Sequence, residues 1–344
     1  MNFYERECRV SVIVPVYNAL CDLKLCVESL KKYVKFNIDQ VIIIDDCSPD
    51  PAVKVYLEEL KTQGFNIIFN EKNLGFSCTV NKGMELTDSD VILLNSDTVV
   101  TSGWIDKIVQ CAYSDNSIAT VTPFSNAATI CSLPIFLQEN KIPKGFTIDQ
   151  YAEVVERCSM KKYPEISVAV GFCMFIKRTV INEIGLFDAE SFKKGYGEEN
   201  DFCWRASEYG YIHVLCDDTF IYHKGTGSFS SKEKMQLMQS HDTILQERYP
   251  ELYQKNSIFC SYDQSRDIRL IIELFSKTSP KCKNILYVLH NDFRNNSERP
   301  CGGTEFHVRD LTYLLRNDFN IFVIYPSGGG YLNLLFILKT KKLV

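Results

Sequence analysis

The chain has 344 residues, of which 45% are apolar and 24% charged. This composition is typical of a globular protein and excludes a wholly disordered one. The formal net charge of −5 argues against a nucleic-acid partner, because such partners usually bind a basic surface. No run of about 18 apolar residues occurs, so the sequence predicts no membrane span.

The fourteen cysteines are scattered and include no C-x-x-C pair, the spacing typical of zinc or redox sites. Residues 1–9 are polar, and the apolar run at residues 10–16 is too short for the core of a signal peptide. We therefore expect a cytoplasmic protein with reduced thiols rather than a disulfide scaffold.

Strands and helices alternate through the first 100 residues. Short apolar runs rich in β-branched residues predict strands at residues 10–16, 41–44, 66–69 and 91–94, and helical spacing predicts helices at 20–34, 52–63 and 79–86. Asn18 is expected to cap the first helix, and Gly64 to end the second. This order predicts an α/β fold with a mostly parallel central sheet and helices on both faces.

Polar side chains stand where these strands end. Tyr17 follows the first strand, and Asp45 and Asp46 follow the second. In open parallel sheets, ligands bind beyond the carboxyl ends of the strands. Tyr17 could stack on a nucleotide base while a carboxylate accepts one of its N–H groups. The alternative is ordinary loop polarity and helix capping.

Asn95, Ser96 and Asp97 follow the fourth strand. A carboxylate at this edge suits a hard divalent cation that is bound to phosphate oxygens. The alternative is a carboxylate at the N-terminus of a helix beginning near Ser102.

The pattern is less regular beyond residue 100. We expect helices at residues 104–112, 178–184 and 232–249 and one through residue 209, with strands at 168–176, 212–215 and 219–222. An acidic cluster of Glu198, Glu199 and Asp201 precedes the helix through residue 209. Acids so close repel one another unless they have a use, and a carboxylate at a cleft can deprotonate an acceptor hydroxyl. The alternative is a solvated acidic turn.

The last segment forms a unit of its own. Residues 251–280 are expected to be a connector that carries one helix. In the C-terminal unit, residues 281–344, a strand at 284–289, a helix at 304–316 and a strand at 320–325 predict a partial Rossmann-like βαβ arrangement.

Taken together, the clusters resemble one family. The stretches VSVIVPVYN, IIIDDCS, NLGFSCTVNKG, VILLNSDTVV, GFCMFIKR, IGLFD, YGEENDFCWRASEYGY and YHKGTGSF occur in the order found in family 2 glycosyltransferases with the GT-A fold. The pattern is similar to bacterial enzymes of surface-polysaccharide synthesis, including rhamnosyltransferase-like members. The resemblance covers a domain at residues 8–250. It implies inverting transfer from a UDP- or dTDP-sugar to a glycan or lipid-linked glycan acceptor, with possible peripheral association at the inner face of the membrane.

The resemblance also assigns roles to single residues. Pro15, Tyr17 and Asp46 would contact the donor's base, with Asp45 beside them. Asn95-Ser96-Asp97 takes the place of the family's Asp-x-Asp motif, with Asn in place of the first acid. Asp97 and His223 would hold Mg²⁺ or Mn²⁺, and the glycine-rich stretch after His223 would form a lid. Glu199 stands where the family has the Asp that acts as general base, and Asp201 is the alternative base.

Residues 281–344 resemble a different family. ILYVLHND, GGTEFHVRDLTYLL and FNIFVIYP look like the opening of a family 4 glycosyltransferase with the GT-B fold. Only the acceptor-side start of that fold is recognisable, which suggests a shortened two-enzyme polypeptide or, alternatively, a docking module.

Two other functions stay open for the whole chain. One is a sugar nucleotidyltransferase, although VPVYNALCD lacks the glycine-rich basic loop of such enzymes, and the other is a non-catalytic glycan-binding or scaffold relative.

Overall fold

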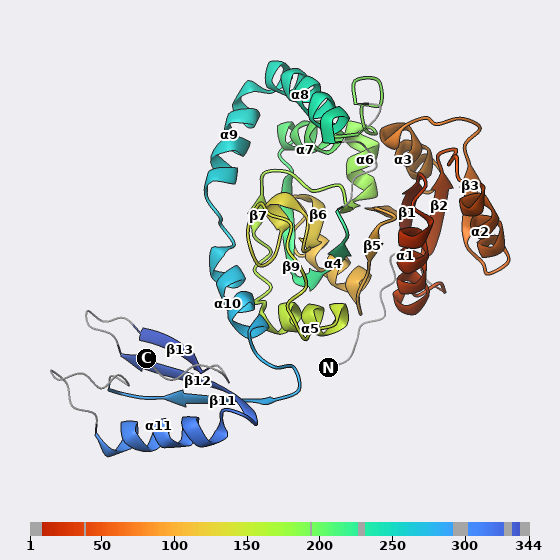
Figure 1. Cartoon of the computed structure of the whole chain (residues 1–344). Coiled ribbons are helices and arrows are strands. Elements are labelled where there is room, and N and C mark those ends of the chain that lie inside the picture. Colours follow the sequence, from red (N-terminus) through yellow and green to blue (C-terminus); the bar gives the residue numbers. More distant parts are fainter. Residues whose placement is uncertain are drawn as a thin grey trace.

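The computed structural model describes residues 9–37, 39–192, 195–225, 231–291, 302–326 and 332–337. A large part, here called the main domain, is built on an eight-stranded sheet, and the C-terminal unit lies at one end of the molecule beyond α10 (Figure 1). The expected α/β architecture with a partial βαβ unit at the C-terminus is confirmed.

The main sheet has the strand order β3-β2-β1-β4-β8-β6-β9-β7. Its strands are β1 (Val10–Val16), β2 (Gln40–Asp45), β3 (Asn66–Phe69), β4 (Asp90–Leu94), β6 (Ile118–Phe124), β7 (Glu165–Ile166), β8 (Cys173–Ile176) and β9 (Ile212–Phe220). β1 is parallel to β2 and β4, and β2 is parallel to β3, while β8 runs antiparallel between β4 and β6. A small separate sheet pairs β5 (Thr98–Val99) with β10 (Tyr222–His223). The sheet is therefore mostly parallel, as expected.

Helices pack on the main sheet because its strands are apolar on both faces. The helices of the main domain are α1 (Leu20–Tyr33), α2 (Pro51–Lys61), α3 (Phe76–Glu85), α4 (Trp104–Ala112), α5 (Ile148–Cys158), α6 (Arg178–Ile184), α7 (Glu198–Glu208), α8 (Ser231–Arg248), α9 (Pro250–Ser261) and α10 (Arg266–Ser276). Every residue of β4 is buried, as in a strand covered on two sides. A glycine brings α3 close to the sheet, since a Cβ at Gly83 would lie only 2.5 Å from Ile13 Cγ2.

Several expectations about local structure were wrong. Asn18 does not cap α1: the N-cap is Ala19, and Asn18 Oδ1 accepts the N–H of Asp50 instead, at 3.3 Å. Only residues 173–176 of the expected strand at 168–176 join the sheet, and the two strands expected at 212–222 are largely one strand, β9. The connector holds two helices, α9 and α10, and both pack against the main hydrophobic core.

The C-terminal unit is a three-stranded sheet with one helix. It contains β11 (Lys283–Val288), α11 (Gly303–Leu315), β12 (Phe319–Pro326) and β13 (Leu332–Ile337). β11 and β12 are parallel, whereas β13 is antiparallel to β12. Its small core is separate from that of the main domain, and Phe275 of α10 packs on Phe322 with ring centroids 5.1 Å apart.

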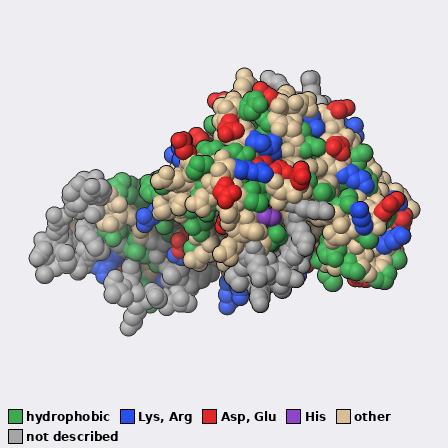
Figure 2. Space-filling model, turned by 90° about the horizontal axis from the view of Figure 1, so that it is seen from above, with side chains coloured by type: hydrophobic (Ala, Val, Ile, Leu, Met, Phe, Trp, Pro, Cys, Tyr) green, Lys and Arg blue, Asp and Glu red, His purple; other side chains and the backbone are tan. Residues whose placement is uncertain are grey.

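Charged side chains of both signs lie on the surface of the main domain (Figure 2). Figure 2 shows Lys and Arg side chains interspersed with Asp and Glu over the main domain, and on this face the described residues form no extended basic surface. Among the described residues, no helix has the length and apolar character needed to cross a membrane.

Candidate active site

A cavity of about 1040 Å³ opens where β1, β2 and β4 end. Most of the residues expected from the sequence to form the site line it: Pro15, Tyr17, Asp46, Asn95, Ser96, Asp97, Glu199 and His223. Asp45 and Asp201 are not among the lining residues. The sheet topology thus gathers side chains from segments more than 100 residues apart.

The two acids that follow β2 differ in what they face. The Asp46 carboxylate accepts hydrogen bonds from the N–H groups of Leu74 and Gly75, at 2.8 and 2.9 Å, and lies on the cavity wall. Asp45 instead accepts from the backbone N–H and the hydroxyl of Ser48. Asp46, which also accepts a hydrogen bond from Asn70 Nδ2 at 2.9 Å, is therefore anchored on the cavity wall, while Asp45 stabilises the turn after β2.

Tyr17 and Pro15 lie at the end of β1 and line the same cavity as Asp46. The Tyr17 side chain is 39% exposed, a large share for an aromatic ring. An exposed ring beside an anchored carboxylate suits a flat, polar ligand such as a nucleotide base.

Asp97 and His223 come together at the small sheet. β10 pairs with β5 so that His223 lies opposite Thr98, and His223 Nε2 is 3.3 Å from Asp97 Oδ1. The other ring nitrogen, Nδ1, donates to the Ala127 carbonyl at 2.6 Å, which fixes the ring and directs Nε2 toward the carboxylate. Burial alone would lower the pKa of His223, but the hydrogen bond and charge of Asp97 outweigh it and raise that pKa.

This pair fits a divalent cation. A carboxylate oxygen and an imidazole nitrogen face one another, and the described residues include no third acid, cysteine or histidine grouped with them. A cation held by so few protein groups completes its shell with water and substrate phosphates, the usual arrangement for Mg²⁺ in nucleotide sites. The sequence did not indicate the residues that support His223: Phe172 stacks on its ring, and Asn126 binds both its backbone N–H and its carbonyl.

The acidic cluster forms the first turn of α7 and is not a solvated turn. Glu199 lines the cavity, and its Oε2 accepts the Gly197 N–H at 3.1 Å. Glu198 also lies on the wall but is only 3% exposed. Burial, and then the neighbouring Glu199, raise the pKa of Glu198 well above its usual value.

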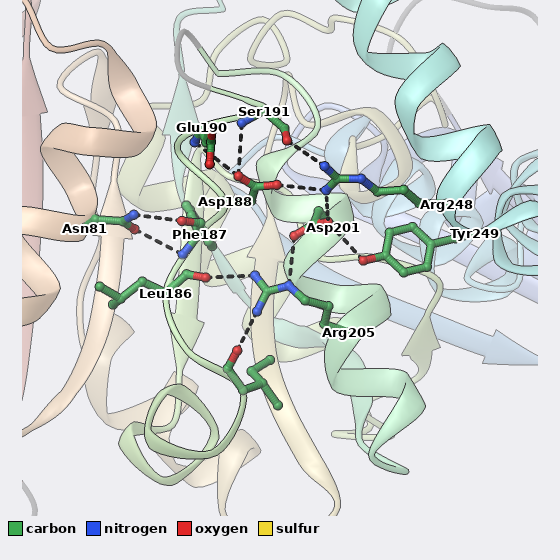
Figure 3. Close-up of polar contacts among 11 residues, drawn as sticks. Asn81, Leu186, Phe187, Asp188, Glu190, Ser191, Asp201, Arg205, Arg248 and Tyr249 are labelled. Atoms are coloured by element: carbon green, nitrogen blue, oxygen red, sulfur yellow. Dashed lines mark hydrogen bonds and ion pairs between the residues drawn. The ribbon is translucent and has the colours of Figure 1, made fainter.

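Asp201 has a different environment, shown in Figure 3. Its side chain is 1% exposed and accepts hydrogen bonds from Arg205 Nε at 2.9 Å, Arg248 Nη1 at 3.2 Å and the Tyr249 hydroxyl at 3.0 Å. A carboxylate with all these partners, away from the cavity, is poorly placed to take a proton from a substrate. The geometry favours Glu199 over Asp201 as the candidate base.

Residues 11–185 match the sequence profile described as Glycosyl transferase family 2. The chain belongs to this family. Among curated relatives, the putative glycosyltransferase EpsH of Bacillus subtilis is 26% identical over 110 residues, 32% of this chain and 32% of EpsH. The minor teichoic acid biosynthesis protein GgaB of Bacillus subtilis is 28% identical over 134 residues, 38% of this chain and 14% of GgaB. The matches thus span about a third or less of these relatives.

Two solved structures resemble the fold. A structure of GalNAc-T7 with UDP, GalNAc and Mn²⁺ superposes with a TM-score of 0.51 at 17% identity, covering 79% of this chain and 55% of the other. The mannosyltransferase PcManGT from Pyrobaculum calidifontis, in complex with GDP-Man and Mn²⁺, gives a TM-score of 0.52 at 12% identity, covering 78% of this chain and 74% of the other. The expected GT-A fold is confirmed.

The cavity of this family 2 chain extends beyond the segment that matches the family profile. Met238, Asp242 and Leu245 of α8 and Asn256 and Cys260 of α9 line it. Nothing in the sequence pattern singled out these residues, because their helices are ordinary in composition and meet the cavity only through tertiary packing. Most of the lid expected after His223 lies outside the described residues, which include Gly225 but not residues 226–230.

Proposed function

We propose that this chain transfers a sugar from a UDP- or dTDP-sugar to a hydroxyl of a glycan acceptor, with inversion at the anomeric carbon, during synthesis of a cell-surface polysaccharide. The observation that carries the proposal is the meeting of the Asp97–His223 pair with Tyr17, Asp46 and Glu199 in one cavity.

In this mechanism the base of the donor lies between Pro15, Tyr17 and Asp46. Asp97 and His223 would hold Mg²⁺ or Mn²⁺, and Asn95 and Ser96 line the cavity beside Asp97. The cation, when bound, supplies positive charge that stabilises the departing diphosphate. The two solved neighbours support a metal and a sugar nucleotide, since both were determined with Mn²⁺ and a nucleotide.

Glu199 is the proposed general base. Its carboxylate accepts the proton of the acceptor hydroxyl while that oxygen attacks the anomeric carbon from the face opposite the diphosphate. One C–O bond forms as the bond to the diphosphate breaks, so the configuration at that carbon inverts. Holding both substrates in this geometry supplies much of the remaining acceleration.

A binding and turnover screen tests the proposal. UDP-, dTDP- and GDP-sugars are added to the chain with Mn²⁺ and again with EDTA, and thermal stabilisation and release of nucleoside diphosphate are measured. We expect one donor to stabilise the chain only with the metal and to be turned over. Metal-dependent binding with no turnover under any condition would instead indicate a scaffold. Conversion of the donor to a nucleoside triphosphate and a sugar 1-phosphate on addition of pyrophosphate would indicate a nucleotidyltransferase.

We further propose a cytoplasmic location in which the chain meets a glycan or lipid-linked acceptor at the inner face of the membrane. The name of GgaB, a teichoic acid biosynthesis protein, supports a cell-envelope polymer as the product. Flotation with vesicles that carry a lipid-linked saccharide tests the membrane association.

For the chain as a whole we propose a transferase domain at residues 8–250, a connector at 251–280 and the C-terminal unit at 281–344, similar to the start of a family 4 glycosyltransferase. The parallel β11–α11–β12 arrangement supports that similarity, and the separate core supports the boundary near residue 280.

A further inference from the structure

The loop before the candidate base has an unfavourable backbone. Gly195, Tyr196 and Gly197 have φ values of 91°, 68° and 120°. The left-handed region is rare for a residue such as tyrosine, and a strained backbone persists only where its surroundings fix it. Since Gly197 donates its N–H to Glu199, the conformation of this loop sets the position of the Glu199 carboxylate.

One face of α8 contacts this loop and the first turns of α7. His241, Leu245 and Arg248 are spaced so that they share that face. His241 Nδ1 donates to the Tyr196 carbonyl at 2.6 Å. Leu245 packs closely against Gly197: a Cβ added to Gly197 would lie 3.3 Å from Leu245 Cδ1.

Arg248 makes several of these contacts, shown in Figure 3. Its guanidinium contacts Asp201 of α7 at 3.2 Å, Asp188 at 2.8 Å and Ser191 Oγ at 2.6 Å. Asp201 is 1% exposed, so breaking its contacts leaves a buried carboxylate short of partners. The same guanidinium therefore joins α8 to α7 and to the loop that precedes Gly195.

We propose that α8, which lies beyond the segment matching the family, is a latch that positions the candidate base, with Arg248 and His241 as its positioning residues. The latch acts through Glu199: it holds the Gly195–Gly197 loop in its left-handed conformation and so directs the carboxylate into the cavity. Its second effect is to place Met238, Asp242 and Leu245 as a wall of the same cavity. This inference rests on the proposed role of Glu199.

Turnover kinetics provide the first test. The probe is the sugar nucleotide, among UDP-, dTDP- and GDP-sugars, that the unaltered chain hydrolyses fastest with Mn²⁺. Arg248→Met should lower kcat by about 10–100-fold, because small misplacements of a catalytic group have effects of this size, while the affinity for UDP or the matching diphosphate changes less than about 2-fold. Arg248→Lys keeps the positive charge but not the planar set of N–H donors. Its kcat should therefore lie between those of the unaltered chain and of Arg248→Met.

A double-mutant cycle separates positioning from simple stabilisation. In the Glu199→Gln background, Arg248→Met should lower kcat no further, because the group through which it acts is already gone. Additive losses in the double variant would overturn the latch. Arg157→Met is the matched control, since Arg157 forms an exposed ion pair with Glu153 away from the cavity.

Hydrogen exchange tests the latch without any substrate, so its result does not depend on the proposed function. Backbone amides of residues 195–201 should exchange faster in Arg248→Met and in His241→Ala than in the unaltered chain and in Arg157→Met. Unchanged exchange there would show that Arg248 and His241 only stabilise the fold. Should the unaltered chain hydrolyse no sugar nucleotide, the proposed function fails while this measurement still decides the latch.

Discussion

The two sheets of this chain differ in how their faces are covered. In the main domain every residue of β4 is buried, since helices lie on both sides. In the described part of the C-terminal unit α11 covers one face, and on the other face Leu286 is 56% and Val288 71% exposed. On β13, which lies on the other side of β12, Leu332 and Leu334 are 71% and 50% exposed.

The register explains why these side chains share a face. Leu286 and Val288 lie opposite Phe322 and Ile324 of β12, and Ile324 lies opposite Leu334 of β13. Alternate strand residues point to opposite faces, so one set packs under α11. Of the other set, Phe322 packs on Phe275 of α10, while Leu286, Val288, Leu332 and Leu334 are exposed. An apolar strand sequence therefore indicates which side chains can be buried, but it does not indicate which helix or segment packs on them. The two parts also differ in the candidate site, since all the described residues that line the cavity belong to the main domain.

The largest loss of activity is expected from substitutions of Asp97 and His223. Such a loss would place donor binding in the main domain rather than in the C-terminal unit. Asp97→Ala should abolish metal-dependent donor binding and turnover, because it removes the only carboxylate in the pair, and His223→Ala should weaken both strongly. Calorimetry with the sugar nucleotides, with and without EDTA, measures this. Binding unaffected by EDTA and by Asp97→Ala would contradict the metal assignment.

The next effect concerns the base. Glu199→Gln keeps the shape of the side chain but cannot accept a proton, so turnover should fall by roughly 10²–10⁴-fold while donor affinity survives. Glu199→Asp should keep partial activity, because Asp also carries a carboxylate that can accept the proton. Steady-state kinetics with a separate binding measurement decides the matter.

Asp201→Asn is the control for that experiment. Because Asp201 is buried against Arg205, Arg248 and Tyr249, we expect a loss of stability together with a smaller loss of turnover than in Glu199→Gln. Near-normal turnover in Glu199→Gln beside an inactive but folded Asp201→Asn would make Asp201 the base.

A pair of leucine truncations, one in each sheet, tests the difference in burial between the two sheets most directly. Leu93→Ala in β4 should destabilise the main domain by about 2–5 kcal/mol, since it leaves a cavity in a strand buried on both faces. Leu286→Ala in β11 should change stability by no more than about 0.5 kcal/mol. Urea unfolding followed by circular dichroism measures both. A large loss at Leu286 would show that the open face is covered in solution.

The smallest effect is expected from removing the C-terminal unit. Among the described residues, none after Cys260 lines the cavity, so deleting residues 281–344 should leave donor binding and turnover largely intact. The deletion variant is compared with the full chain in the same hydrolysis assay. A well-folded deletion variant without activity would show that the C-terminal unit contributes to the site.

The sequence alone predicted the parallel half of the main sheet and most of the candidate site. Buried strands are recognised by their apolar, β-branched runs, and parallel strands place their carboxyl ends at one edge, so Tyr17, Asp46 and Asp97 were expected to meet. The acidic cluster that forms the first turn of α7 was also recognised, as was the βαβ order of the C-terminal unit.

Only the tertiary structure decided which of two neighbouring acids faces the cavity. Asp45 and Asp46 are adjacent, and their different roles follow from partners in separate loops: Ser48 for one, Leu74 and Gly75 for the other. Asp201 and Glu199 are likewise indistinguishable by type, but Asp201 is held by Arg248 and Tyr249, 47 and 48 residues later in the chain. A sequence pattern reports local spacing, whereas the direction and charge of a buried side chain depend on contacts that form only when distant segments pack.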